Sequence, residues 1–324
     1  MDTSRAVSRY ACGALLTFLL GCEAPLVLDR VEEQFARPTQ RTDLLQAVAA
    51  SGDTLVAVGN QGAVILSRDR GASWERQVLE GKPFLMAITT CPDGSFLALD
   101  YGKNVWIADP DAANWHNKPI ETYETVQTLA CDPNGNFWVA GSFSTVMKST
   151  DQGDTWSETS LDEDLYFTSI QFLDKNTVLM TGEFGVVVRS DDGGDNWEYL
   201  EPLPDEFYPQ DAHFISADVG WAVGLAGTVM VTIDGGNSWE RQDTGTSAPL
   251  YNIAKNGSKL YAVGGNGTIL KSELSDVDPG SNSWSAVEHR ERIRFYLRGA
   301  APVGDSHLLV AGGAGALFLI PTDT

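Results

Sequence analysis

A repeated, glycine-centred stretch constrains the fold of this chain more than any other feature of its sequence. The first copy runs from Gly59 to Trp74, and six further copies follow at spacings of 40 to 48 residues. The residues that open the seven copies are Gly59, Asp100, Gly141, Gly182, Gly224, Gly264 and Gly312. Short apolar runs separated by turn residues predict strands inside each copy. A period of about 40 to 50 residues with strand patterning indicates a propeller.

Each repeat predicts four antiparallel strands. In the first repeat we expect them at 44–50, 54–58, 63–67 and 74–79. The chain is therefore predicted to be all-β, with a single seven-bladed β-propeller of four-stranded blades over residues 30–324. The seventh repeat supplies three strands, and residues 30–35 resemble the outer strands of other repeats. We expect this N-terminal strand to complete the last blade, which removes an exposed sheet edge.

The second half of the repeat has the form Ser-x-Asp-x-Gly-x-Ser/Thr-Trp, and four copies are nearly intact. Short Asp and Ser side chains hydrogen-bond nearby backbone amides, and glycine allows the positive φ of a tight reversal. We therefore predict that these aspartates cap hairpins, with the tryptophans packed beneath, and that they are not catalytic. The predicted structural residues are Asp69, Trp74, Asp151, Trp156, Asp192, Trp197, Asp234 and Trp239.

This motif resembles the Asp-box, or bacterial neuraminidase (BNR) repeat. Seven such blades, each opened by a Val-Gly-x-x-Gly-like turn, are similar to the photosystem II stability and assembly factor family of propellers. In that family the propeller is a non-enzymatic scaffold that holds membrane-protein intermediates. The resemblance implies a protein-binding role without a cofactor. This chain is more acidic than that pattern, so the resemblance implies the class of role and not the photosynthetic partner.

Sialidases and xyloglucan-type endoglucanases share the Asp-box, which leaves a glycan-binding or glycoside-hydrolysing role as the alternative. The sialidase Phe/Tyr-Arg-Ile-Pro motif is absent, and endoglucanases of this type use two tandem propellers. Hydrolysis needs two carboxylates at a defined separation. Asp43, Asp100, Glu183 and Asp211 are candidates near the channel mouth, and nothing in the sequence selects a pair. The four histidines are scattered without ligand spacing, so no metal site is predicted.

Residues 1–22 are expected to be a lipoprotein signal peptide, followed by a short tether at 23–29. Arg5 and Arg9 precede an apolar run that is too short to span a bilayer. Leu-Leu-Gly-Cys then resembles the lipobox of bacterial lipoproteins, which implies lipidation of Cys22; an ordinary secretory signal is the alternative. Because Cys22 is not followed by Asp, we expect the bacterial cell envelope, at the outer rather than the inner membrane.

The charge of the chain limits its partners. It carries 22 basic and 44 acidic residues, a net charge of −22. Such a surface repels nucleic acid and anionic lipid. We expect a monomer that is held to its membrane by a lipid anchor and that binds a protein or a glycan.

Two sets of residues are candidates for contacting that partner. Aligning the inner strands places seven residues at one equivalent position, and six of them are polar: Gln46, Met86, Gln127, Ser169, Asp211, Asn252 and Arg298. They either contact a ligand at the channel mouth or line a water-filled channel. The second set is aromatic: Tyr101, Phe143 and Phe184 occupy turns of consecutive repeats, near the acidic residues Glu124, Glu183, Asp205 and Glu206.

Two cysteines of the predicted propeller occupy similar places in neighbouring repeats. Cys91 and Cys131 both stand at the end of an inner strand. An envelope location permits a disulfide, whereas equivalent positions of neighbouring blades can lie too far apart to bond. The sequence leaves both possibilities open.

Overall fold

The computed structural model describes residues 37–275, 278–281, 283–289 and 293–322. The chain divides into two units, Met1–Ala36 and Arg37–Thr324, and the second is the propeller. The expected signal peptide, the tether, Cys22 and the strand expected at 30–35 lie outside the described residues. No helix among the described residues has the length and apolar character needed to cross a membrane.

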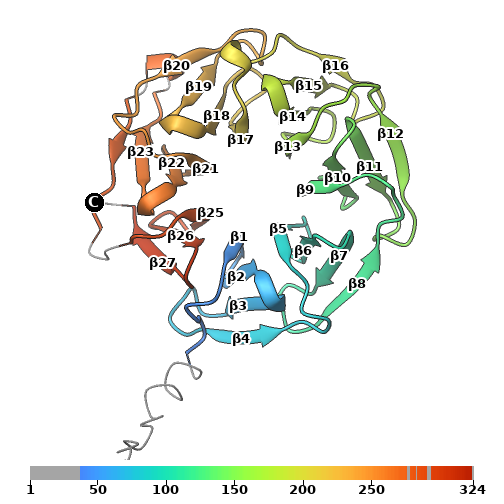
Figure 1. The fold of residues 1–324 in the computed structure, drawn as a ribbon, viewed down its shortest axis with the longest axis vertical. Coiled ribbons are helices and arrows are strands. Elements are labelled where there is room, and N and C mark those ends of the chain that lie inside the picture. Colours follow the sequence, from blue (N-terminus) through green and yellow to red (C-terminus); the bar gives the residue numbers. More distant parts are fainter. Residues whose placement is uncertain (1–36, 276–277, 282, 290–292, 323–324) are drawn as a thin grey trace, which may run out of the picture. The chain divides into compact units, whose positions relative to one another are not determined.

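Seven blades surround a central channel in the propeller unit (Figure 1). In the described residues six blades have four strands and the seventh has three, ordered along the chain from the axis outward. This confirms the predicted all-β, seven-bladed fold. The four strands of the first blade agree with their predicted ranges to within one residue at each end.

The inner strands are β1 (Leu45–Ser51), β5 (Leu85–Thr90), β9 (Val126–Cys131), β13 (Phe167–Phe172), β17 (Pro209–Phe214), β21 (Leu250–Asn256) and β25 (Leu297–Val303). The second strands are β2 (Thr54–Gly59), β6 (Phe96–Asp100), β10 (Phe137–Gly141), β14 (Val178–Gly182), β18 (Gly220–Gly224), β22 (Lys259–Gly264) and β26 (His307–Gly312). The third strands are β3 (Ala63–Ser67), β7 (Asn104–Ala108), β11 (Thr145–Ser149), β15 (Val187–Ser190), β19 (Val229–Thr232), β23 (Ile269–Glu273) and β27 (Leu317–Pro321).

The outer strands are β4 (Glu75–Val78), β8 (Trp115–Pro119), β12 (Ser157–Ser160), β16 (Glu198–Tyr199), β20 (Glu240–Gln242) and β24 (Ser285–Ala286). Six short 3-10 turns complete the described elements: η1 (Asn60–Gly62), η2 (Glu183–Gly185), η3 (Pro204–Glu206), η4 (Leu225–Gly227), η5 (Gly265–Gly267) and η6 (Pro279–Ser281).

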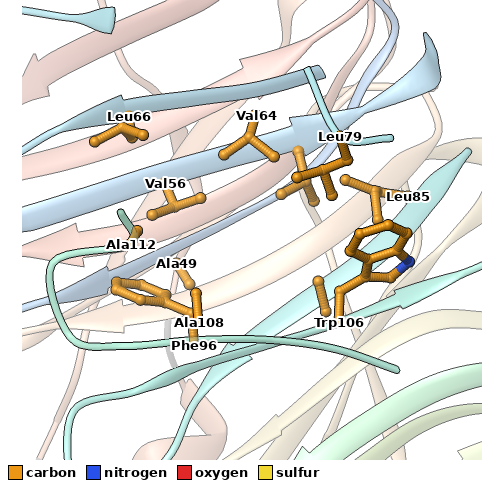
Figure 2. Close-up of a cluster of buried hydrophobic side chains, with 12 residues drawn as sticks. Ala49, Val56, Val64, Leu66, Leu79, Leu85, Phe96, Trp106, Ala108 and Ala112 are labelled. Atoms are coloured by element: carbon orange, nitrogen blue, oxygen red, sulfur yellow. The ribbon is translucent and has the colours of Figure 1, made fainter. Parts of the chain in front are cut away.

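The core lies between the blades. The second strands β2 and β6 are buried along their whole length, because each blade is covered on both faces by its neighbours. Figure 2 shows the layer between the first two blades, where Val56 and Leu66 pack in one cluster with Phe96 and Trp106. Similar clusters fill the other blade interfaces, so each blade depends on its neighbours for burial of its apolar face.

The two ends of the described propeller meet in the ring. The inner strand β1 packs against β25 of the seventh blade. Leu44 forms an isolated antiparallel bridge with Gly313, and the amide of Gly315 donates a hydrogen bond of 2.9 Å to the carbonyl oxygen of Asp43. Segment 40–44 therefore ties the first blade to the second-to-third-strand turn of the last.

A disulfide joins the second and third blades. Cys131 is the last residue of β9 and Cys91 directly follows β5, and the two are bonded with their Cα atoms 5.1 Å apart. Inner strands of adjacent blades converge near the axis, which brings these equivalent positions within bonding distance. The structure thus settles the question that the sequence left open.

Candidate partner-binding face

Six of the turns between second and third strands share one backbone conformation. Their middle residues lie in the left-handed region with φ between 50 and 57°: Gln61, Phe143, Phe184, Ala226, Asn266 and Ala314. The glycine that opens the turn of the third blade, Gly141, shows what holds the conformation. A Cβ on Gly141 would lie 1.8 Å from the carbonyl oxygen of Thr125, in the loop that leads into the same blade. Close backbone packing between turn and loop therefore requires the Gly of the repeat.

Two of these left-handed positions carry large apolar side chains that face solvent. Phe143 has φ 50° and Phe184 has φ 56°, and their side chains are 54% and 55% exposed. A bulky residue in this region is unusual and costs on the order of 1 to 3 kcal/mol. Burial of the two rings does not offset that cost within the folded chain. The pair therefore has the character of a binding feature.

Further aromatic residues continue this pair across neighbouring blades. Tyr101, in the equivalent turn of the second blade, is 71% exposed. Tyr166 directly precedes β13 and Tyr208 directly precedes β17, and both are partly buried. Burial raises the pKa of the Tyr166 phenol, and the nearby phenols of Tyr208 and Tyr101 raise it further. These three tyrosines, together with Phe143 and Phe184, form what we call the aromatic arc, over blades two to five.

The central channel is a cavity of about 530 Å³. Its lining includes all seven residues that the inner-strand alignment placed together: Gln46, Met86, Gln127, Ser169, Asp211, Asn252 and Arg298. The alignment thus locates the channel wall residue by residue. The hydrogen bonds that these side chains make differ from one blade to the next.

Several polar groups of the wall bind neighbouring blades together. The Asp211 carboxylate accepts hydrogen bonds from the Asn252 amide group at 2.6 Å and from the Ile253 backbone at 3.0 Å. Asn252 in turn accepts one of 3.0 Å from the backbone amide of Ala300. Blades five, six and seven are therefore joined through side chains. Gln171 makes a similar two-way contact with the Phe214 backbone, at 2.9 and 2.8 Å, between blades four and five.

The surroundings of this wall change the titration of two of its groups. Burial raises the pKa of Asp211 to about 7, against the hydrogen bonds from the Ile253 and Ala212 amides, which lower it. Burial lowers the pKa of His213 to about 4, and the charge of Lys255 acts in the same direction. Asp211 is thus poised to change charge near neutral pH, whereas His213 is neutral there.

Other wall residues are less committed to the fold. Ser169 shares a hydrogen bond of 2.7 Å with Thr181 of its own blade, and Gln46 donates one of 3.3 Å to the Leu44 carbonyl. The guanidinium of Arg298 lies 5.7 Å from the ring centre of Tyr251. The side chain of Gln127 makes no hydrogen bond within the described part of the chain.

The Asp-box turns lie at the outer side of the blades, away from the channel. Asp69 accepts hydrogen bonds from the Ser73 hydroxyl and backbone at 2.5 and 2.8 Å and from Ser67 at 2.7 Å. These hydrogen bonds lower the pKa of Asp69 to about 2, and the one from the Ser73 hydroxyl has the largest effect. Equivalent bonds surround the other three aspartates, Asp151, Asp192 and Asp234. The four tryptophans Trp74, Trp156, Trp197 and Trp239 are partly or wholly buried in the clusters between blades.

Two of the four candidate carboxylates are occupied by structural contacts. Asp43 is buried in a bidentate ion pair with Arg76, at 2.8 and 3.0 Å. Asp100 is buried and accepts a hydrogen bond of 2.7 Å from the Trp106 indole. Among the described residues that line the channel, Asp211 is the one carboxylate. No group of three or more potential metal ligands gathers within the described ranges.

The blade-to-blade contacts are what sequence reasoning missed. Gln171 and Thr168 belong to the channel wall and form hydrogen bonds with the fifth blade. Thr168 donates one of 2.9 Å to the Pro209 carbonyl. Thr168 directly precedes the aligned residue Ser169 and Gln171 follows it by two positions, so the polar residues near the aligned position were the available signal. Arg290 and Arg292, which precede blade seven in the sequence, lie outside the described residues.

Comparison with known proteins relates the chain to one group of propellers. Residues 138–206 match the family model described as photosynthesis system II assembly factor YCF48. The photosystem II assembly lipoprotein Ycf48 of Prochlorococcus marinus (strain MIT 9312) is 28% identical over 158 residues, which is 47% of this chain and 45% of that protein. The photosystem II assembly protein Ycf48 of Synechococcus sp. (strain JA-3-3Ab) is 29% identical over 96 residues, 29% of this chain and 28% of that protein. The matched regions thus span less than half of either relative.

Solved structures share the fold over most of the chain. YCF48 from Cyanidioschyzon merolae has a TM-score of 0.70 at 15% identity and covers 89% of this chain and 98% of its own. A structure described as YCF48 bound to D1 peptide has a TM-score of 0.71 at 14% identity, covering 88% and 93%. A virginiamycin B lyase from Staphylococcus aureus reaches 0.72 at 13% identity, covering 89% and 97%. At such identities the likeness establishes the fold alone, since one propeller fold hosts unrelated functions.

Proposed function

Because the chain is a Ycf48-like β-propeller of the BNR-repeat type, we propose that it is a non-enzymatic scaffold that binds a partner protein through its channel face. The observation that carries the proposal is the exposure of Phe143 and Phe184 in left-handed turns of neighbouring blades. An exposed apolar patch on a folded domain is typical of a protein contact. A YCF48 structure described as bound to D1 peptide supports the same class of partner.

The scaffold is proposed to act at a membrane. The Leu-Leu-Gly-Cys motif supports lipidation at Cys22, and the relative from Prochlorococcus marinus is named a lipoprotein. Several acyl chains in one anchor hold a protein stably to a bilayer. With the tether at 23–29, the propeller stays close to the lipid surface, and membrane proteins are the partners within reach. We place the anchor in the bacterial cell envelope, at the outer membrane.

The test is affinity capture of the full-length, lipidated protein from its own membranes after cross-linking. The wild type is compared with the triple variant Tyr101→Ala, Phe143→Ala, Phe184→Ala. We expect one membrane protein to be recovered with the wild type and lost with the variant. The matched control is the double variant Gln61→Ala, Asn266→Ala, which alters the same turns in blades one and six and should capture as the wild type does.

Two results would contradict the scaffold. Equal recovery by the wild type and the triple variant would move the contact away from the aromatic arc. Failure of the wild type to capture any protein, together with retention on immobilised polysaccharide, would favour the glycan-binding alternative. Thermal melting of all three proteins checks that loss of capture does not reflect loss of folding.

A further inference from the structure

The aromatic arc is bordered by loops of one sign of charge. The loops 120–125, 161–166 and 200–208, which join blades two to five, contain eight Asp and Glu residues and no Lys, Arg or His. Seven of the eight are exposed, and Glu124 is partly buried. We call the arc together with these three loops the acidic aromatic sector.

Hydrogen bonds show that the turns and the loops form one continuous surface. The amide of Ser144, next to Phe143, donates a hydrogen bond of 2.9 Å to the Leu165 carbonyl of the second loop. The amide of Glu183, next to Phe184, donates 2.8 Å to the Tyr166 carbonyl. The Leu203 amide of the third loop donates 2.9 Å to the carbonyl of Gly185. The aromatic turns of blades three and four therefore lie directly against the acidic loops 161–166 and 200–208.

The carboxylates of the sector have no cationic partner within the described part of the chain. None of the ion pairs there involves a residue of the three loops. Glu124 accepts a hydrogen bond of 2.8 Å from the Ser142 hydroxyl, which is neutral. Lys103, in the turn that carries Tyr101, donates a hydrogen bond of 2.6 Å to the Thr122 carbonyl. The sector thus keeps a negative field over its exposed rings.

The other half of the same face differs in charge. Arg294 and Arg298, at and before the start of β25, are exposed there, and Arg298 points over the ring of Tyr251. A ligand drawn by the negative sector is therefore repelled at the seventh blade. This polarity gives an extended ligand a preferred location over blades two to five.

We propose that the acidic aromatic sector binds an extended peptide segment of a partner protein that carries lysine or arginine side chains between apolar ones. The inference rests on the scaffold function proposed above and adds the chemistry of the partner. Apolar side chains of the peptide cover Phe143 and Phe184, and its cations lie over the Tyr and Phe rings while pairing with the loop carboxylates. A neutral glycan gains nothing from these carboxylates, and an anionic chain or lipid surface is repelled by them.

The test uses fluorescence anisotropy with the full chain and three labelled probes. The first peptide contains lysine, phenylalanine and serine in alternation, the second replaces each lysine by glutamate, and the third replaces each phenylalanine by serine. We expect the first to bind at least about tenfold more tightly than either of the others. Its affinity should fall as salt is raised, because the ion pairs are exposed.

Two variants test the location. The double variant Phe143→Asn, Phe184→Asn installs the residue that blade six carries at this turn, and the triple variant Glu163→Gln, Asp205→Asn, Glu206→Gln removes charge without changing shape. Each should weaken the first peptide by about tenfold or more. The control Glu198→Gln, Glu240→Gln removes two exposed charges from the outer strands and should bind as the wild type does.

Equal affinity for the lysine and glutamate peptides, or unchanged binding by both sector variants, would overturn the proposal. Binding of neutral oligosaccharides that is lost in the Phe143, Phe184 variant would reassign the sector to glycans. The outcome is separable from that of the scaffold. If the charge variant still captures the membrane protein, the scaffold function stands and the basic peptide is ruled out as its ligand. If the peptide binds but no membrane protein is captured, the peptide site stands and the scaffold function is contradicted.

Discussion

The turns of blades three and four have the same backbone as those of blades one and six, but they carry different side chains. Phe143 and Phe184 stand where Gln61 and Asn266 stand, all four in the left-handed region. The backbone belongs to the repeat, since loop and turn pack too closely for a Cβ at the opening glycine. The side chains at this position, by contrast, differ from repeat to repeat. Function in a repeat protein is therefore sought at positions where some blades carry different side chains on a backbone conformation that all of them share.

The two halves also differ in how their blades are joined. Cys91 and Cys131 link blades two and three covalently, whereas Asp211 and Asn252 link blades five to seven through hydrogen bonds. The aromatic arc extends from the covalently linked blades two and three to blades four and five, which Gln171 joins through hydrogen bonds.

The disulfide should contribute most. The double variant Cys91→Ser, Cys131→Ser opens a loop of 40 residues, and chain entropy sets the loss of stability at up to roughly 4 kcal/mol. Denaturant unfolding of wild type and variant measures it. Reducing agent should lower the stability of the wild type toward that of the variant and leave the variant unchanged. An equal response of both proteins to reduction would show that the bond does not form.

On the hydrogen-bonded side, Asp211 should make stability depend on pH. Its folded pKa of about 7 lies above the ordinary value of 3.8, so its contribution is present in full below that value and is lost as pH rises through about 7. Melting temperatures measured from mildly acidic to mildly alkaline pH should fall for the wild type relative to Asp211→Asn.

His213 serves as the internal check on that series. Its pKa is lowered to about 4, so its contribution is present above the ordinary value of 6.5 and is lost as pH falls through about 4. This effect has the opposite sign and is shared by wild type and Asp211→Asn. Parallel melting curves for the two proteins across neutral pH would contradict the assignment to Asp211.

The smallest effect concerns backbone strain in the aromatic half. Replacing Phe184 by Asn should leave stability unchanged or raise it by about 1 kcal/mol or less, because Asn tolerates the left-handed region better than Phe. Thermal melting measures this, with Asn266→Phe in blade six as the reverse change, which should destabilise. A clear loss of stability in Phe184→Asn would show that the ring stabilises the fold. It would contradict the assignment of this side chain to partner binding.

The fold was predictable because the repeat carries it. Seven spaced copies predicted seven blades, and alignment of the inner strands located Gln46, Ser169 and Arg298 on the channel wall. The contacts of Asp211 with Ile253, and the bond between Cys91 and Cys131, were not predictable. They depend on the distance between neighbouring blades at one height along the axis, and a single sequence does not encode that distance in any local pattern.

The closing contacts of the ring have a consequence for how the chain folds. Most strand pairs of a blade are hairpins whose partners are close in sequence, and such contacts form early because little loop entropy is lost. The bridge between Leu44 and Gly313 joins residues near opposite ends of the described chain. We expect it to form last on refolding and to open first under load, so that the slowest kinetic phase reports the meeting of the first and seventh blades.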